Sequence, residues 1–390
     1  MIPLERRPVI VDALRTPIGT SGGALRQLDV VGLLAPVLAQ LAHRSPEPIG
    51  EVCIGNVRGP GGNPARVAAL AAGLPTDVPA ITVDRQCGSG MAAIEHSVGM
   101  LSGLAEGLRI AGGVQSASTQ PWTYLPPSRP GADPVRYERA PFTPASFGDP
   151  EMGVAADLVA AECGITRQRQ DAYALRSHQR AVTCQRAGIF DDEILPLAGL
   201  VHDERPRAGF TPERLARFRP AFSPDGTCTA ANSCGVNDGA AAVLLCDGDT
   251  ATRLGLGGLR VVDVVTTAGR PDRPGLGIVA AVRRLVERTG IGLDQIDVVD
   301  FNEAFAGQVL ACLDQLGIDE TRNCPQGGAI ALGHPWAASG AVQLVRLFTQ
   351  LVRAPQQLGA RYGLAGIAIG GGQGTAMLVE RIRPSERENR

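Results

Sequence analysis

The most informative absence in this sequence is lysine: none occurs among its 390 residues, so all 37 basic residues are arginine. Without lysine the protein has no Schiff-base nucleophile and no P-loop, whose lysine contacts nucleotide phosphates. Histidine is also scarce, with five residues, and aromatic residues make up 4% of the chain. A nucleophile that needs an imidazole as its base therefore has few candidate partners.

The sequence also lacks long apolar runs, strong net charge and paired cysteines. Its hydrophobic stretches are too short or too broken by glycine to span a bilayer, and the segment MIPLERRPVIVDALRTP lacks the apolar centre of a signal peptide. The nine cysteines form no C-x-x-C pair, and the formal net charge is −2. We therefore expect a cytoplasmic protein with reduced thiols, without a structural metal, that binds neither nucleic acid nor membranes.

Short β-branched runs alternate with alanine-rich helical stretches in residues 1–116 and again after residue 237. This alternation predicts an α/β protein with a mostly parallel sheet and crossover helices. Between Ser116 and about Pro150 the alternation stops, and proline, glycine and aromatic residues dominate. A stretch of this length without periodicity is typical of a functional loop region.

The later part of the chain echoes the first. The segment CGSGMAAIE, with Ser89 and Gly90, resembles WAASGAVQL, with Ser339 and Gly340, and RIAGGVQS resembles AIGGGQGT. The offset between the paired segments is about 250 to 260 residues, which indicates an internal repeat. Chance similarity between glycine- and alanine-rich segments is the alternative. We favour a duplicated α/β domain whose halves present equivalent helix N-termini to one shared site.

Cys87, in VDRQCGSGMAAIE, is the candidate nucleophile. It lies where a β-branched run gives way to a helix of small residues. A helix N-terminus stabilises a thiolate through its dipole and its free N–H groups, and small neighbours let a substrate approach. The alternative is a buried structural cysteine, which is common in proteins.

His334 and Asn302 are the candidate partners of this thiol. His334, in GGAIALGHPWAASGA, lies in the counterpart of the Cys87 segment, although a loop histidine is often structural. Asn302, in IDVVDFNEAF, follows a strand of the buried type at the edge where open α/β sheets bind ligands. Its amide can hold a water or stabilise an oxyanion, or it can cap a helix.

The glycine turn in GIAIGGGQG leads into the strand-like segment TAMLVERI rather than into a helix. A phosphate-binding loop requires a helix N-terminus after the glycines, so the turn is not one. Its glycines instead allow backbone N–H groups to approach a carbonyl oxygen closely.

Together the segments VDRQCGSG, NEAF, GGAIALGHPWAASGA and GGGQG resemble, in this order, the thiolase family of acyl-CoA C-acyltransferases. The stretches ALRSHQRA, RPAF and NDGAAA extend the resemblance over nearly the whole chain. It implies an α/β thiolase fold of two βαβαβαββ halves in a five-layer αβαβα arrangement. The implied domains are residues 1–116 with 237–258, a loop domain at 117–236 that faces coenzyme A, and residues 259–390.

The resemblance also implies roles for the candidate residues. Cys87 would attack an acyl thioester and become S-acylated, while His334 takes its proton. His334 and a water on Asn302 would form one oxyanion hole, and the backbone N–H groups of Cys87 and Gly370 the other. The thioester would be carried by coenzyme A or an acyl carrier protein, with no bound cofactor. The family forms dimers and tetramers, and an accessory protein is a further partner to consider.

The sequence departs from the family at positions that bear on this chemistry. Ala368 stands where thiolases carry a second cysteine, the acid/base of the carbon–carbon step. Cys234 stands where a serine near the pantetheine is usual, and Trp336 replaces a small residue after the His–Pro pair. With Met152 and Arg207, Cys234 and Trp336 are the candidate contacts to coenzyme A.

Three functions therefore remain open. The first is a thiolase-like acyltransferase that acts through S-acyl-Cys87, by thiolysis or Claisen condensation, with an altered carbon–carbon step. The second is acyl transfer to a non-carbon or aromatic-carbon acceptor, which needs no α-deprotonation. The third is a catalytically silent thiolase-like partner subunit.

Overall fold

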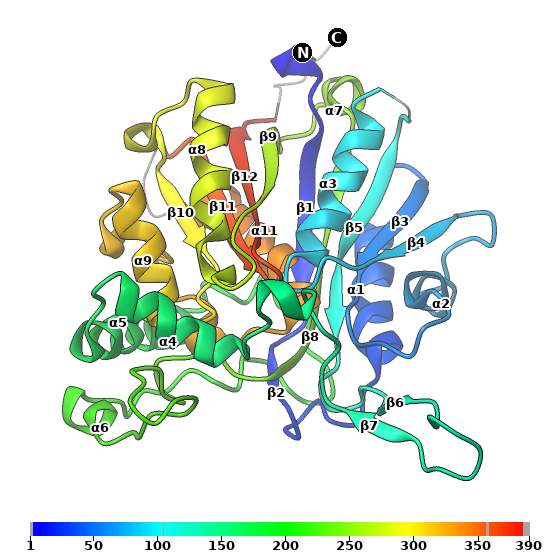
Figure 1. Cartoon of the computed structure of the whole chain (residues 1–390). Helices are drawn as coiled ribbons and strands as arrows, with labels where there is room; N and C mark the ends of the chain where they lie inside the picture. The colour runs from blue at the N-terminus through cyan, green and yellow to red at the C-terminus, as the bar shows by residue number, and fades with distance from the viewer. Residues whose placement is uncertain (1–2, 104, 356–358, 385–390) are drawn as a thin grey trace.

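The computed structural model describes residues 3–103, 105–355 and 359–384, and one mixed sheet lies at its centre (Figure 1). The strand order is β4-β3-β5-β8-β1-β9-β12-β11-β10. The two halves of the sheet meet at β1 and β9, where only Val9–Arg260 and Ile10–Leu259 are paired. The sheet is therefore two smaller sheets joined along a short seam.

The first half of the molecule supplies β4, β3, β5, β8 and β1, with helices on both faces. Its helix α1 begins after Asp29, whose carboxylate accepts a hydrogen bond from Gly32 N, and buries one stripe of valine and leucine against the sheet. The elements are β1 (Val9–Arg15), β2 (Gly19–Thr20), α1 (Val30–Arg44), β3 (Ile49–Gly55), α2 (Pro64–Ala71), β4 (Ala80–Val83), α3 (Ser89–Leu101), β5 (Leu108–Gln115), β8 (Asn237–Cys246) and α7 (Gly248–Leu254).

The second half repeats this order. Strands β10, β11, β12 and β9 take the places of β3, β5, β8 and β1, and a parallel bridge between Val299 and Asn323 takes the place of the β3–β4 pairing. The structure thus confirms the predicted duplication. The elements are β9 (Gly258–Ala268), α8 (Gly277–Thr289), β10 (Val298–Phe301), α9 (Ala306–Leu316), α10 (Ala329–Leu332), α11 (Ser339–Phe348), β11 (Tyr362–Ile369) and β12 (Gln373–Ile382).

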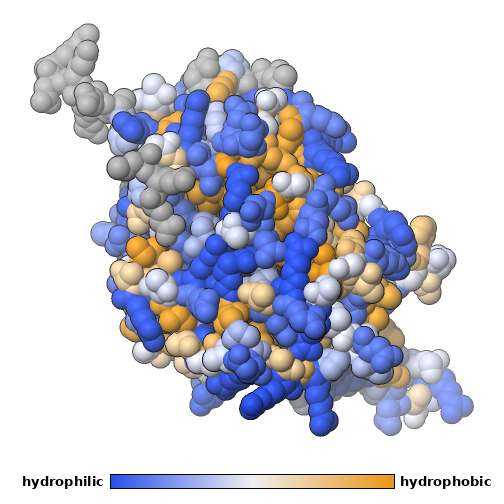
Figure 2. Space-filling model, turned by 90° about the vertical axis from the view of Figure 1, so that its left-hand side faces the viewer, coloured by the Kyte–Doolittle hydropathy of each residue, from blue (hydrophilic) through white to orange (hydrophobic). Residues whose placement is uncertain are grey.

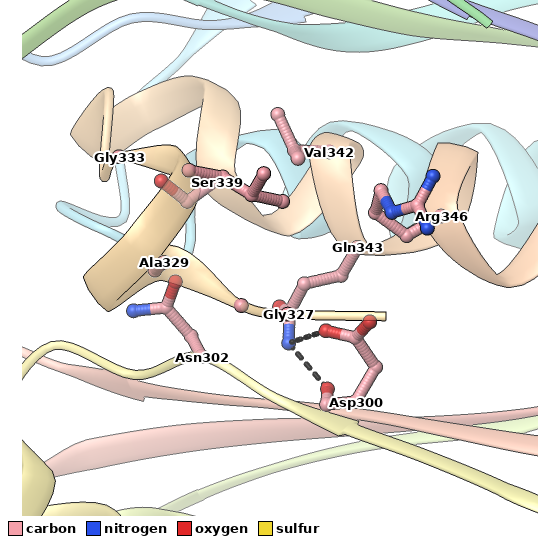
Figure 3. Close-up of a pocket in the computed structure, with 11 residues that line it drawn as sticks. Asp300, Asn302, Gly327, Ala329, Gly333, Ser339, Val342, Gln343 and Arg346 are labelled. Carbon is pink, nitrogen blue, oxygen red and sulfur yellow. Dashed lines mark hydrogen bonds between the residues drawn. The ribbon is translucent and has the colours of Figure 1, made fainter. Parts of the chain in front are cut away.

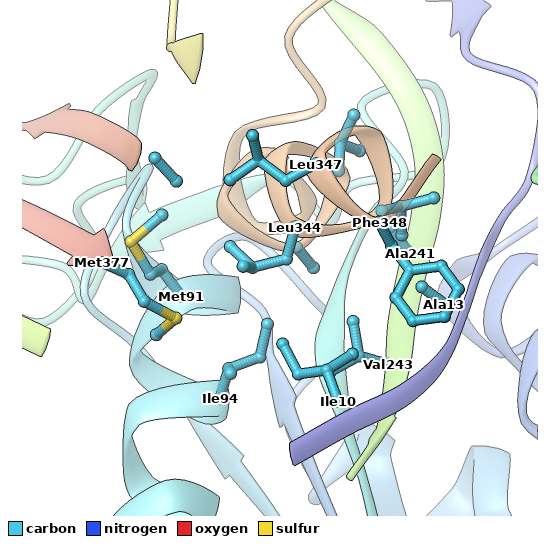
Figure 4. Close-up of a cluster of buried hydrophobic side chains, with 14 of the residues drawn as sticks. Ile10, Ala13, Met91, Ile94, Ala241, Val243, Leu344, Leu347, Phe348 and Met377 are labelled. Carbon is cyan, nitrogen blue, oxygen red and sulfur yellow. The ribbon is translucent and has the colours of Figure 1, made fainter. Parts of the chain in front are cut away.

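Helices α3 and α11 lie between the two half-sheets and form the central layer. They approach closely because glycines face each other: a Cβ at Gly90 would lie 2.6 Å from Ala337 O, and one at Gly340 would lie 2.7 Å from Met91 Cβ. Around them packs a hydrophobic cluster that includes Met91, Ile94, Leu344, Leu347, Phe348, Ile10 and Met377 (Figure 4). Two further clusters lie under α1 and α2 and under α8 and α9. These are the five αβαβα layers that the resemblance to thiolases implies.

The segment between β5 and β8 folds over the carboxyl ends of the strands. It contains β6 (Thr123–Leu125), β7 (Val135–Tyr137), α4 (Met152–Glu162), α5 (Arg167–Arg186) and α6 (Pro212–Ala216). Arg169 anchors α5 to the second half through Asp314 and Glu320, at 2.7 and 2.8 Å. The exact domain boundaries stay a prediction, and residues 385–390 of the predicted last domain lie outside the described residues.

The face that carries α8, α9 and α5 is largely hydrophilic, with scattered hydrophobic residues (Figure 2). None of the helices in the described parts of the chain has the length and apolar character needed to cross a membrane.

Candidate active site

Cys87 lies in a sharp turn between β4 and α3. The residue before it, Gln86, has a φ of 48°, which is uncommon for a residue other than glycine. Ser89 Oγ holds the turn, because it donates to Gln86 O at 2.6 Å and accepts from Arg85 N at 2.8 Å. Backbone strain of this kind clusters at functional sites.

The thiol of Cys87 is only partly exposed, and burial raises its pKa to about 12. The nearby thiol of Cys234 contributes in the same direction, whereas a backbone hydrogen bond opposes it. Loss of hydration is the largest cause of this shift, so Cys87 needs a proton acceptor before it can attack.

His334 is buried at the N-terminal side of α11. Its backbone N–H donates to Asn237 Oδ1 at 2.9 Å, and its ring Nδ1 lies 2.6 Å from Ser339 Oγ. Burial lowers the pKa of the imidazole to about 4, so the ring is neutral near pH 7. Neither Asn237 nor Ser339 could be assigned a role from the sequence, because their contacts arise only in the folded chain.

Asn302 follows β10 directly and is 4% exposed. Its backbone N–H donates to Gly366 O at 2.8 Å, while its side-chain amide makes no hydrogen bond to another residue that the structure describes. Asn302 and Ser339 line one small cavity of about 20 Å³, room for about one water molecule (Figure 3). The amide that the sequence singled out is therefore available to a water or a ligand.

Glu303 fixes the turn that carries Asn302. Its carboxylate accepts hydrogen bonds from Tyr173 Oη at 2.8 Å, Ser177 Oγ at 2.7 Å and Ile330 N at 3.1 Å. These partners belong to α5 and α10, and α10 leads directly to His334. No local pattern in the sequence indicates this junction, because its partners lie far apart in the chain.

The glycine turn joins β11 to β12 and lies beside the Cys87 turn. A Cβ at Gly88 would lie 2.4 Å from Ile369 Cδ1, which places the Cys87–Gly88 peptide against the end of β11. Gly370 follows at once, and a Cβ there would lie 2.8 Å from the ring of Phe142. Ala368, two residues earlier, is paired with Gly374 and carries no group that can transfer a proton.

Cys234 lies between the segments that carry Asn302 and His334. Its backbone N–H donates to Ala304 O at 2.9 Å, and the neighbouring Val236 forms a parallel bridge with His334. Burial raises the pKa of its thiol to about 11, and the charge of Arg205 opposes the shift. The candidate pantetheine position is thus part of the same group of turns.

The other predicted contacts lie at the edges of this group. The guanidinium of Arg58 lies 5.8 Å from the centre of the Trp336 ring. Met152 begins α4, and the next residue, Gly153, packs against Phe222. Phe222 in turn packs edge-on against Phe305, with ring centres 5.6 Å apart.

Arg207 and its neighbour Arg205 are held by hydrogen bonds to nearby residues. The backbone N–H of Arg207 donates to His178 Nδ1 at 3.3 Å, and its guanidinium donates to Glu204 O at 2.8 Å. Its neighbour Arg205 donates to Ile330 O and Ser233 O, at 2.9 and 2.8 Å. Within the described residues, no group of three or more histidine, cysteine, aspartate or glutamate side chains could hold a metal ion.

The chain is similar to known proteins over nearly its whole length. Residues 8–249 match the family model of the thiolase N-terminal domain, and residues 258–381 match that of the thiolase C-terminal domain. An acetyl-CoA acetyltransferase of Pseudomonas aeruginosa is 40% identical over 397 residues, covering 96% of this chain and 99% of that protein. The crystal structure of the acetyl-CoA acetyltransferase of Bacillus anthracis superposes with a TM-score of 0.88 at 35% identity, covering 97% and 99% of the two chains.

Proposed function

The chain belongs to the thiolase family and is an acyltransferase, and we propose that it forms an S-acyl intermediate on Cys87 from an acyl-CoA thioester. The observation that carries this proposal is the meeting of two equivalent helix N-termini, one with Cys87 and one with His334, across the Gly90–Ala337 contact. The imidazole of His334 is buried and neutral, so it can accept a proton. The thiol of Cys87 is protonated, so it must lose one before it can attack.

In the proposed reaction the sulfur of Cys87 attacks the thioester carbonyl, the thioester C–S bond breaks, and coenzyme A leaves as the thiol. His334 accepts the proton of Cys87 and returns a proton to the departing sulfur. The N–H groups of Cys87 and Gly370 stabilise the oxyanion of the tetrahedral intermediate, and Asn302 serves the second oxyanion through a water. Donors of this kind lower barriers by about 3 to 4 kcal/mol each.

The carbon–carbon step is the part in which this chain departs from its family. Forming or cleaving a bond next to a carbonyl needs an acid/base at the α-carbon, and Ala368 provides none. We propose that the acyl enzyme passes its acyl group slowly to carbon and more readily to an acceptor that needs no α-deprotonation. The presence of Cys87, His334 and Asn302 in one group argues against a silent partner subunit.

Release of coenzyme A tests the proposal. Incubation of the protein with excess acetyl-CoA should release one equivalent of free coenzyme A per chain in a rapid phase, followed by slow turnover. Chromatographic measurement of coenzyme A over time would show both phases. A release that never reaches one equivalent, with Cys87→Ala as the blank, would contradict acyl-enzyme formation.

We also propose that two copies of the chain associate through β4. This strand is the last of the sheet and pairs with β3 on one side only, and Ile81 on it is 37% exposed. Val67 and Leu70 on the adjacent α2 are 47% and 44% exposed. Open sheet edges with apolar neighbours favour pairing with another strand. Size-exclusion chromatography with light scattering should show a dimer or tetramer, and Ile81→Arg should shift it to a smaller species.

A further inference from the structure

The cavity behind Asn302 is lined by glycine and apolar residues and also by polar side chains that the proposed reaction leaves unused. Asp300, Gln343 and Arg346 line it together with Asn302 and Ser339 (Figure 3). Asp300 and Asn302 are two residues apart on an extended segment, so their side chains project to the same side, toward the central layer. The carboxyl group of Asp300 and the amide of Asn302 therefore line the same cavity.

Two atoms at this cavity lack partners within the described chain. Gln343 is 3% exposed and Arg346 is 2% exposed, yet Gln343 Oε1 and Arg346 Nε make no hydrogen bond to the protein. The amide nitrogen of Gln343 is engaged, because it donates to Gly366 O at 2.9 Å and approaches Asp300 Oδ1 at 3.5 Å. Buried polar atoms that lack protein partners are commonly satisfied by an internal water.

Asp300 and the nearby Glu303 are buried acids that form no ion pair with a basic residue in the described parts of the chain, whereas the neighbouring charges are paired. Arg15 bonds Glu193 and Asp203, at 2.8 and 2.7 Å, and Arg346 pairs with Glu193 as well. All four are buried, and their two positive and two negative charges balance. The carboxyl group of Asp300 is 5% exposed and adds a fifth charge when it ionises.

Because this buried carboxyl has no paired cation, it keeps its proton to a higher pH than an exposed aspartate does. Burial raises its pKa to about 7, the charge of Arg346 opposes the shift, and that of Glu303 adds to it. Other neighbours that face the carboxyl are the amides of Gln343 and Gln350, which favour the charged form. Cys324 Sγ approaches Asp300 Oδ1 at 3.9 Å. Asp300 can thus accept or release a proton near pH 7.

We infer that Asp300 is a positioning residue and proton reservoir for His334, reached through a water in the cavity and through the hydroxyl of Ser339. The inference rests on the proposed role of Cys87 as the nucleophile. The proton of Cys87 passes to His334 Nε2, while His334 Nδ1–H passes its proton to Ser339 Oγ. The hydroxyl proton of Ser339 moves to the water, and the water protonates Asp300. Cys87 becomes a thiolate, Asp300 becomes neutral, and no net charge is gained.

This route explains how one buried histidine serves two roles. An imidazolium is disfavoured at His334 because burial lowers its pKa to about 4. The relay converts one neutral tautomer into the other, so no imidazolium forms. After the transfer His334 carries its proton on Nε2, the form that donates to an oxyanion.

Alkylation of Cys87 by iodoacetamide tests the relay without requiring acyl transfer. The rate at the Cys87 peptide, measured by mass, should fall about tenfold per pH unit below pH 7 and reach a plateau above it, because ionised Asp300 accepts the proton. In Asp300→Asn the plateau should vanish and the rate near pH 7.5 should drop about tenfold or more. Asp297→Asn is the matched control. It removes a carboxylate that accepts two backbone N–H bonds at the start of the same strand, and it should keep the plateau.

Ser339→Ala separates the relay from a through-space effect of the carboxylate. It should also abolish the plateau, while the pH profile of alkylation at Cys234 in the same samples stays unchanged. A plateau that survives in either Asp300→Asn or Ser339→Ala would overturn the inference. If Asp300→Asn fails to fold, Ser339→Ala decides alone. Coenzyme A release is read separately, so failure of the relay and failure of the acyl enzyme are distinguishable.

Discussion

The two halves of the molecule carry the same polar residues at equivalent places and use them differently. Asn56 follows β3 as Asn302 follows β10, and Ser89 begins α3 as Ser339 begins α11. In the first half the Asn56 amide donates to Val114 O at 2.9 Å, and Ser89 bonds only the backbone of its own turn.

In the second half the equivalent side chains, Asn302 and Ser339, face the candidate active site. The Asn302 amide has no partner within the described residues, and Ser339 Oγ lies against the ring of His334. The two repeated halves therefore share a fold but differ in their polar contacts. In the first half the side chains bond backbone groups, and in the second half they line a polar site. The predictions below change one half at a time.

The largest effect is expected from His334. His334→Asn removes the proposed base, and acyl-enzyme formation should slow by about a hundred- to ten-thousand-fold. The control is His96→Asn, which removes an imidazole from α3 of the first half. Rapid-quench mass measurement of the acyl adduct compares the two. Equal rates in both variants would refute the assignment of His334.

A thiol in the glycine turn should supply the acid/base that we propose is missing at Ala368. Ala368→Cys should raise thiolysis of acetoacetyl-CoA by about a hundred-fold, because it returns an acid/base to the α-carbon. Ala368→Ser, with a hydroxyl that is a much weaker acid, is the matched control. Wild-type turnover already equal to that of the cysteine variant would show that Ala368 does not limit the carbon–carbon step.

The paired serines should separate function from stability. Ser339→Ala should slow acyl-enzyme formation about tenfold with little change in melting temperature, because its hydroxyl orients His334. Ser89→Ala should cost about 1 kcal/mol of unfolding free energy, since a partly buried backbone N–H and C=O lose their partner. Rates from single turnovers and urea unfolding would measure both. The comparison fails if the two variants behave alike.

The smallest effect concerns pH and stability. The place of Asp300 in β10 corresponds to that of Ile54 in β3, so only the second half carries a titratable group there. The folded-state pKa of Asp300 is raised to about 7, so between about pH 4 and 7 the folded chain holds a proton that the unfolded chain has released. Its contribution to stability therefore declines as pH rises through this window.

Asp300→Asn removes this dependence, and Ile54→Val serves as its control. Relative to wild type, the asparagine variant should gain unfolding free energy between pH 4 and 7 and then stay level. Urea unfolding at pH 5 and pH 8 measures the difference. If the unfolding free energies of the variant and the wild type differ by the same amount at pH 5 and pH 8, the pKa of Asp300 is not raised by burial and the prediction is wrong.

The internal repeat and the α/β class were predicted from the sequence, because period, glycine turns and repetition are local signals. The duplication at Ser89 and Ser339, the strand after GGGQG and the helix after Cys87 all follow from such signals, and the structure has each of them. The roles assigned to Cys87, His334, Asn302 and Gly370 remain predictions, although the structure brings their segments together.

The prediction of a mostly parallel sheet was wrong. Among the described strands of the main sheet, β3 with β4, β3 with β5 and β10 with β11 pair in parallel. In contrast, β8, β1, β9 and β12 pair antiparallel with their neighbours, since pairs such as β11 and β12 are joined by a turn and not by a crossover helix.

What the sequence could not show are properties set by long-range contacts. The raised pKa of the Cys87 thiol follows from burial that only the folded chain creates. The contact of His334 with Asn237, the junction at Glu303 and the balance that leaves Asp300 without a cation each join residues far apart in the chain. No pattern of neighbours in the sequence encodes them.

The central claim is that Cys87 carries the acyl group, and peptide mass spectrometry after brief incubation with acetyl-CoA tests it most directly. The account predicts a single acetyl adduct on the peptide that contains Cys87, which disappears in Cys87→Ala and persists in Cys234→Ala. An adduct that remains in Cys87→Ala, or no adduct in the wild-type chain, would contradict it.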